Sequence, residues 1–267
     1  MTEEEPHPRF RVRVTGSGPP AKTTRVRLPR LGGRYEGLPN VEFRRVLVRG
    51  VSFANMAFDY FEAEGTTFAG CDFSGARLHG TFGLLRQTRF TDCRFDRARL
   101  SLIEPGQARF DGCRFADTDM KRWAAEANEF VGCVFSGLVS EVNFWGRPPA
   151  DWLDQLRPRR EVNEFRGNDF RQAELMNLRF LGGIDLGAQL LPSSSEYIRL
   201  DRISERIRRI RPVVESWEDR DRDEGLILLD VYSREGYEDQ PELFAHRWDL
   251  DVPREVANRV WALLEAA

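Results

Sequence analysis

The sequence predicts a mainly β protein, in which a β-solenoid of square coils is followed by a smaller helical domain. Of the 17 phenylalanines between residues 38 and 186, 14 fall on a repeat of five residues. Small residues often stand two positions before them. From residue 193 onward, apolar residues instead alternate at spacings of three and four, which is typical of helices. The chain of 267 residues is 41% hydrophobic and 31% charged, a composition typical of a soluble globular protein.

A period of five matches neither a helix nor a flat strand, and it indicates a chain that turns a corner after every five residues. If three residues of each side are extended, the residue two positions before the Phe or Leu also points inward. That position should be small, and it carries alanine or cysteine in many repeats. The cysteines are Cys71, Cys93, Cys113 and Cys133. Glycine recurs at the corners, where a positive φ is needed, at Gly70, Gly112 and Gly132.

The spacing also predicts the coil length and the position of an insertion. Phe95, Phe115 and Phe135 lie 20 residues apart, which is four sides of five. Phe130 and Phe165 lie 35 apart, so we expect an inserted loop with a short helix at about residues 146–162, within a solenoid spanning 38–192. The insertion contains Trp152, a candidate partner contact.

At this point the sequence resembles the pentapeptide-repeat family. Its unit is a small residue, a polar residue, a central Leu or Phe and two corner residues, as in Ala76-Arg77-Leu78, Ala98-Arg99-Leu100 and Cys71-Asp72-Phe73. The resemblance covers a little over half of the chain and implies a right-handed quadrilateral β-helix. It does not imply one function, because most members have none assigned. Some members mimic DNA and protect gyrase or a related topoisomerase from inhibitors.

The two ends of the solenoid need caps. Residues 1–37 predict a strand-like cap, since Phe10, Val12 and Val14 alternate with arginines and a Gly/Pro loop leads into a second such segment at 24–28. Residues 193–267 predict a helical domain. We expect its first helix to be capped by Ser195 and ended near residue 211 by Pro212. The charged run 218–224 reads as a solvated connection, and Asp251 as the cap of a last helix.

The first helix carries an apolar stripe with two interpretations. It consists of Leu200, Ile203, Ile207, Ile210 and Val214. The stripe either packs on the last coil and within the helical domain, or it forms the seam of a homodimer.

Chemistry-bearing residues are sparse, and we expect a protein that is not an enzyme. The four cysteines contain no C-x-x-C pair, which argues against zinc. None of the three histidines has a nucleophile or metal ligand at a recognisable spacing. We therefore expect no catalytic residues, no metal and no cofactor. The sequence shows neither a membrane span nor a signal peptide, so we expect a cytoplasmic protein that does not contact membranes.

Charge separates two functional hypotheses. The net charge is −3, and residues 38–146 hold 14 acidic and 13 basic residues, far from the dense negative charge of DNA. Outward positions instead carry arginines, of which Arg89, Arg94, Arg109 and Arg114 are candidate partner contacts. Nucleic acid is disfavoured because acidic residues are interspersed. The leading hypothesis is a protein-interaction scaffold with an unidentified partner, and the alternative is a DNA-mimicking topoisomerase protector.

Overall fold

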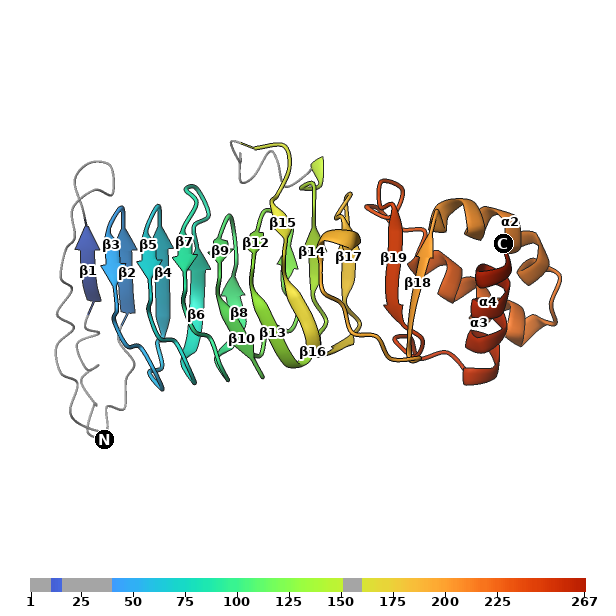
Figure 1. Cartoon of the computed structure of the whole chain (residues 1–267), viewed down its shortest axis with the longest axis horizontal. Helices are drawn as coiled ribbons and strands as arrows, with labels where there is room; N and C mark the ends of the chain where they lie inside the picture. The colour runs from blue at the N-terminus through green and yellow to red at the C-terminus, as the bar shows by residue number, and fades with distance from the viewer. Residues whose placement is uncertain (1–10, 16–39, 151–159) are drawn as a thin grey trace, which may run out of the picture.

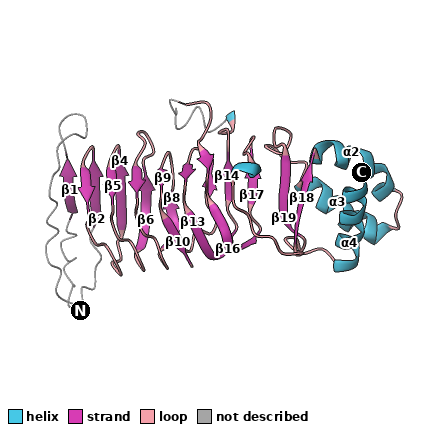
Figure 2. Cartoon of the chain, in the orientation of Figure 1, coloured by secondary structure: helices cyan, strands magenta, loops and turns pink. Residues whose placement is uncertain are grey.

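The computed structural model describes residues 11–15, 40–150 and 160–267, and it shows a β-solenoid of about five turns followed by three helices (Figure 1). The strands stack side by side along the long axis, and the helices gather at the C-terminal end (Figure 2). The predicted β-solenoid with a C-terminal helical part is therefore confirmed. Its square cross-section and its hand remain predictions.

The solenoid strands form four parallel sheets. The first sheet contains β1 (Arg11–Thr15), β2 (Asn40–Arg44), β4 (Tyr60–Glu64), β6 (Arg77–Phe82) and β8 (Arg99–Glu104). The second contains β3 (Leu47–Arg49), β5 (Thr67–Ala69), β7 (Arg89–Thr91), β9 (Arg109–Asp111), β12 (Glu129–Val131) and β15 (Phe165–Arg166). The third contains β10 (Arg114–Ala116), β13 (Val134–Ser140) and β16 (Asp169–Met176). The fourth contains β11 (Ala124–Ala125), β14 (Asn143–Trp145) and β17 (Arg179–Leu181).

The repeat of five places the phenylalanines in inner columns. Phe90 pairs in register with Phe68 and with Phe110, and the ring centroids are 5.0 Å apart in both pairs with nearly parallel planes. Phe115 stacks on Phe95 at 5.1 Å and on Phe135 at 5.0 Å. These six rings are almost completely buried, so the spacing predicted the core correctly.

The phenylalanines outside the repeat also face inward. Phe61 and Phe82 are fully buried on the first sheet, where each lies opposite a small residue of the neighbouring coil. Phe82 pairs with Ala63 and Phe61 pairs with Gly80. A Cβ on Gly80 would collide with the backbone of Phe61, and Gly80 has a φ of 141°. Only glycine fits this position without moving the coil.

The cysteine column is buried as the sequence predicts, and all four thiols are free. Each thiol donates to a backbone carbonyl one coil earlier. Cys93 Sγ lies 3.5 Å from the oxygen of Phe68, and Cys113 Sγ lies 3.3 Å from that of Phe90. Burial raises the pKa of the Cys113 thiol well above its ordinary value. Because all four side chains are buried, the column consists of core thiols that weakly link successive coils.

The N-terminal segment extends the first sheet. β1 pairs in parallel with β2, with Val12 opposite Val41 and Val14 opposite Phe43. The other residues of the expected cap, including Phe10 and the segment 24–28, lie outside the described residues. The middle of the insertion, with Trp152 and its expected short helix, also lies outside them.

The first helix of the C-terminal part begins later than predicted. Residues 197–201 form β18 (Tyr197–Asp201), which pairs antiparallel with β19 (Glu242–His246). Leu200 therefore lies on a strand opposite Leu243, and Ser195 does not cap a helix. The alternating pattern Tyr-Ile-Arg-Leu-Asp was the signal for a strand.

Three further expectations about this domain were wrong. α2 (Ile203–Glu215) continues through Pro212, and the charged run 218–224 forms the first turns of α3 (Asp219–Val231). α4 (Arg254–Ala266) begins after Pro253 with no side-chain cap, so Asp251 does not cap it. The three helices pack together, and this buries Ile203, Ile207, Ile210 and Val214 within the domain. Because these residues are buried, a homodimer seam formed by them would require the helices to separate. The homodimer remains a prediction.

The C-terminal domain caps the last coil with side chains. The short 3-10 turn η1 (Leu186–Ala188) follows β17, and after it Leu190 still pairs with the coil before it, its carbonyl accepting from the amide of Phe170. Gln240 Oε1 accepts from the amides of Gly183 and Ile184, and Asp249 Oδ1 accepts from that of Asn177. These oxygens accept from three amides at the end of the solenoid, as the carbonyls of a next coil would. Among the described residues, no helix is both long and apolar enough to cross a bilayer.

Candidate functional site

Arginines stack in register on three outer columns of the solenoid. The cross-coil pairs are Arg77 with Arg99, Arg89 with Arg109, and Arg94 with Arg114. Like charges placed directly opposite each other on neighbouring strands are destabilising. Each column therefore needs acidic side chains of this chain, or of a partner, to offset the repulsion.

Arg109 forms ion pairs with acidic side chains of the chain itself. Its Nε donates to both carboxylate oxygens of Asp111 at 3.0 Å, and its Nη1 lies 3.2 Å from Glu129 Oε1 and 2.6 Å from Glu164 Oε2. Burial alone would lower the pKa of Arg109, but the hydrogen bonds that it donates to Asp111 and Glu164 raise it. The Arg109 side chain is only 16% exposed, so it ties three coils together and offers little to a partner.

The same network anchors the base of the insertion. Arg160 donates through Nε to Asn163 Oδ1 at 3.1 Å and through Nη2 to the carbonyl of Ala127. Its Nε also lies 3.7 Å from Glu129 Oε2, an oxygen that accepts from Gln87 as well. Burial lowers the pKa of Arg160. These contacts hold the insertion on the solenoid, so we read them as structural.

In the other two arginine columns, acidic side chains offset the positive charge of some arginines and not of others. Arg114 Nε lies 3.1 Å from Asp96 Oδ1, but Arg94 makes no ion pair with a described residue. Arg77 and Arg99 are both exposed, and neither makes an ion pair within the part of the chain that is described. Arg97 lies at the corner between these columns and has a φ of 57°. It is also exposed and makes no ion pair with a described residue.

We call Arg77, Arg94, Arg97 and Arg99 the arginine corner. Acidic residues border it, because Asp72 is the cross-coil neighbour of Arg94 and Asp119 is that of Arg99. Ser101 Oγ donates to Asp119 Oδ2 at 3.0 Å, and Asp96 is engaged by Arg114. The corner thus comprises four exposed arginines, of which Arg77 and Arg99 are cross-coil neighbours, with an acidic border.

The candidate contacts predicted from sequence fall into three groups. Arg89 and Arg94 are exposed and lack ion pairs with described residues, whereas Arg109 and Arg114 are engaged within the chain. Trp152 lies outside the described residues. The candidate set omitted Arg77, Arg97 and Arg99. The signal for Arg77 was an outward arginine with no acidic residue one coil away, since its neighbours are Ala57 and Arg99.

Groups for chemistry do not converge in the described part of the chain. No cluster there brings together three histidine, cysteine or carboxylate side chains that could hold a metal ion. His79 packs against Tyr60 with ring centroids 6.4 Å apart, and His246 Nδ1 accepts from the amide of Trp248 at 3.2 Å. Both of these histidines therefore make packing or backbone contacts within the fold.

Comparison with known proteins adds little to this picture. No protein-family model matches the sequence, and no curated protein matches it. Two similar solved structures are trypsin-treated variants of QnrB1, a plasmid-mediated fluoroquinolone resistance protein. One is 13% identical, covers 68% of this chain and 77% of QnrB1, and has a TM-score of 0.19. The other is 19% identical, with 54% and 77% covered and a TM-score of 0.16. Superposition this poor supports no inference, so the fold assignment rests on the strand ladders themselves.

Proposed function

We propose that the chain is a non-enzymatic interaction scaffold of the pentapeptide-repeat type, whose arginine corner binds an acidic segment of a partner protein. The observation that carries the proposal is the in-register pair Arg77 and Arg99, which are exposed and make no ion pair with a described residue. Like charges directly opposite each other on neighbouring strands are destabilising, and partner carboxylates would offset that repulsion.

The charge distribution supports a protein partner over the DNA-mimic alternative. A DNA mimic should present dense negative charge, but residues 38–146 are close to neutral and carry three arginine columns. We therefore do not propose topoisomerase protection. The four free thiols support a reducing compartment such as the cytoplasm.

A quantitative pull-down from native cytoplasm tests the proposal. The bait variants are the wild type, Arg77→Gln/Arg99→Gln and the control Arg49→Gln/Arg220→Gln, which removes two exposed arginines elsewhere. We expect one stoichiometric partner that is retained by the control and reduced at least tenfold by the Arg77/Arg99 variant. Equal recovery by both variants, or no stoichiometric partner, would contradict the proposal. Relief of like-charge repulsion should leave the Arg77/Arg99 variant as stable as the wild type.

A further inference from the structure

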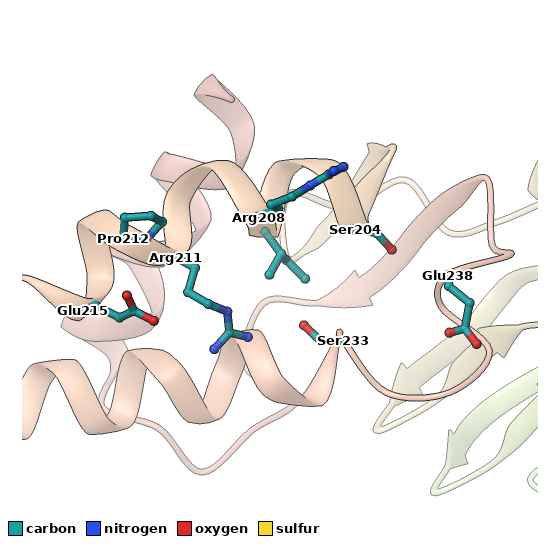
Figure 3. A pocket seen from close by; sticks show the side chains of 8 residues that line it. Ser204, Arg208, Arg211, Pro212, Glu215, Ser233 and Glu238 are labelled. Carbon is teal, nitrogen blue, oxygen red and sulfur yellow. The ribbon is translucent and has the colours of Figure 1, made fainter.

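Two surface features outside the arginine corner are candidates for ligand binding. The first is a cavity of about 500 Å³ that lies against α2 (Figure 3). Its lining holds Arg208 and Arg211 as well as Glu215 and Glu238, so its charges favour neither a cationic nor an anionic ligand. The second is an exposed column of three large side chains on the outer face of the first sheet, on the same strands as two arginines of the corner.

This column consists of Tyr60, His79 and Leu102, which come from β4, β6 and β8. His79 is the cross-coil neighbour of Leu102, and the ring centroids of His79 and Tyr60 lie 6.4 Å apart in an edge-to-face arrangement. All three side chains are exposed, and Leu102 is 67% exposed. Single exposed apolar residues are ordinary, but three large side chains in contiguous register form a surface that a ligand can cover. We call these three residues the Tyr-His-Leu column.

A β-bulge places Leu102 in the column. His79 stands two positions after Arg77 on β6. Its neighbour on β8, Leu102, stands three positions after Arg99, so β8 holds one extra residue. Without that residue Ser101 would lie opposite His79, but its hydroxyl donates to an aspartate of the next coil at 3.0 Å. Bulges commonly re-aim a side chain at a functional site, and this one brings a leucine rather than a serine to the surface.

The charges on the two sides of the Tyr-His-Leu column are opposite. Arg77 and Arg99 precede the column on β6 and β8, and neither makes an ion pair with a described residue. On the other side, Glu62 is held by Arg44 with Oε1 2.8 Å from Nη2. Glu104 on that side is exposed and makes no ion pair within the described part of the chain. A ligand carboxylate is therefore attracted on the arginine side of the column and repelled on the glutamate side.

We infer that the partner segment proposed for the arginine corner carries a large apolar side chain beside its acidic residue, and that this side chain binds the Tyr-His-Leu column. The inference rests on the proposed function, because the same segment supplies the carboxylates for Arg77 and Arg99. Arg77 and His79 are two positions apart on β6, which is about 7 Å in a strand, and side chains on one face of an extended segment have the same spacing. A segment lying along the strands therefore places an acidic residue on the arginines and an apolar residue, two positions away, on the column.

Phage display of random decapeptides on the immobilised full chain tests the inference. We expect the enriched peptides to hold Asp or Glu two positions from a large aromatic or aliphatic residue. An enriched set without this pair, or a selection that enriches no peptide over the starting library, would overturn the inference. The most enriched peptide, synthesised with a dye, then gives dissociation constants by fluorescence anisotropy.

Leu102→Thr removes the exposed leucine and leaves both arginines in place. We expect it to weaken binding of the labelled peptide at least fivefold, because the apolar side chain of the peptide loses its main contact. The control Leu190→Thr changes a leucine that is 47% exposed near the C-terminal end of the solenoid, and it should change binding less than twofold. Tyr60→Thr, at the other end of the column, should weaken binding as Leu102→Thr does. Because these side chains are exposed, all three variants should melt close to the wild type. Equal binding by Leu102→Thr and Leu190→Thr would overturn the inference.

Arg77→Gln/Arg99→Gln separates the inference from the proposed function. If this variant loses the peptide and Leu102→Thr binds it as tightly as the wild type, the arginine corner stands and the apolar contact is overturned. If the arginine variant binds the peptide as the wild type does, the proposed function fails together with the inference. If sedimentation shows a wild-type dimer that Leu102→Thr converts to a monomer, a second copy of the chain covers the column and the inference is overturned.

Discussion

Gln240 is the side chain on which the end of the solenoid depends most. Its Oε1 accepts from the amides of Gly183 and Ile184 at 3.1 and 2.9 Å, and its Nε2 donates to the carbonyls of Ile184 and Glu242 at 2.8 and 3.0 Å. Gln240→Met keeps most of the side-chain volume and removes all four bonds. At about 1 kcal/mol for each bond, we expect a loss of about 3 to 4 kcal/mol in the free energy of unfolding.

Urea denaturation and hydrogen exchange measure this loss. The amides of Gly183 and Ile184 should exchange much faster in Gln240→Met, because their acceptor is gone. Gln172→Met is the control, since Gln172 is an exposed glutamine of β16 for which no side-chain bond is seen. If Gln240→Met lost less than about 1 kcal/mol, or if exchange at these two amides were unchanged, the capping account would be wrong.

Three further predictions concern the core and one buried carboxyl. In the native protein all four thiols should resist a thiol reagent, and reaction of more than one would contradict the interior column. Gly80→Ala should lower the melting temperature strongly, whereas Ala54→Gly at a half-buried turn should change it less; similar shifts would exclude the proposed close approach to Phe61. Burial raises the pKa of Glu126 from 4.5 to about 7. The charged form is thus disfavoured in the fold, and wild-type stability should fall as pH rises from 4.5 to 7. Glu126→Gln should remove this dependence in urea titrations, and an unchanged slope would show another origin.

The solenoid could be predicted because its signal repeats. Each coil places a large apolar residue at the same position, so Phe90, Phe95 and Phe110 report the same packing rule many times. Gly70 and Gly112 were also predicted correctly as corners, with φ of 60° in both. A local exception such as Phe82 does not obscure a period that so many residues share.

The helical domain was harder because tertiary contacts override local preferences there. Pro212 should end a helix, but burial of Ile210 and Val214 on either side stabilises α2 through it. Leu200 fits the helical spacing of the following residues, yet pairing with β19 makes it part of a strand. The partner strand lies more than 40 residues away, and no local pattern connects the two.

Contacts between residues far apart in the sequence also decide which charged residues are paired. Sequence positions place Arg109 and Arg99 on equivalent outward columns, but only Arg109 is followed two residues later by an acidic partner, Asp111. Glu164 adds a partner that the sequence does not reveal, because it reaches Arg109 only where the insertion returns the chain beside β12. That contact spans 55 residues, so no local pattern predicts it.

The affinity of the recovered partner for the arginine corner is the measurement that tests the central claim most directly. Calorimetric titration of that partner into the wild type, Arg77→Gln/Arg99→Gln and Arg49→Gln/Arg220→Gln gives the three dissociation constants. We predict a loss of at least tenfold for the Arg77/Arg99 variant only, together with a weaker dependence on salt, because two charge-assisted contacts are removed. Dissociation constants within twofold of one another for all three proteins would contradict the account.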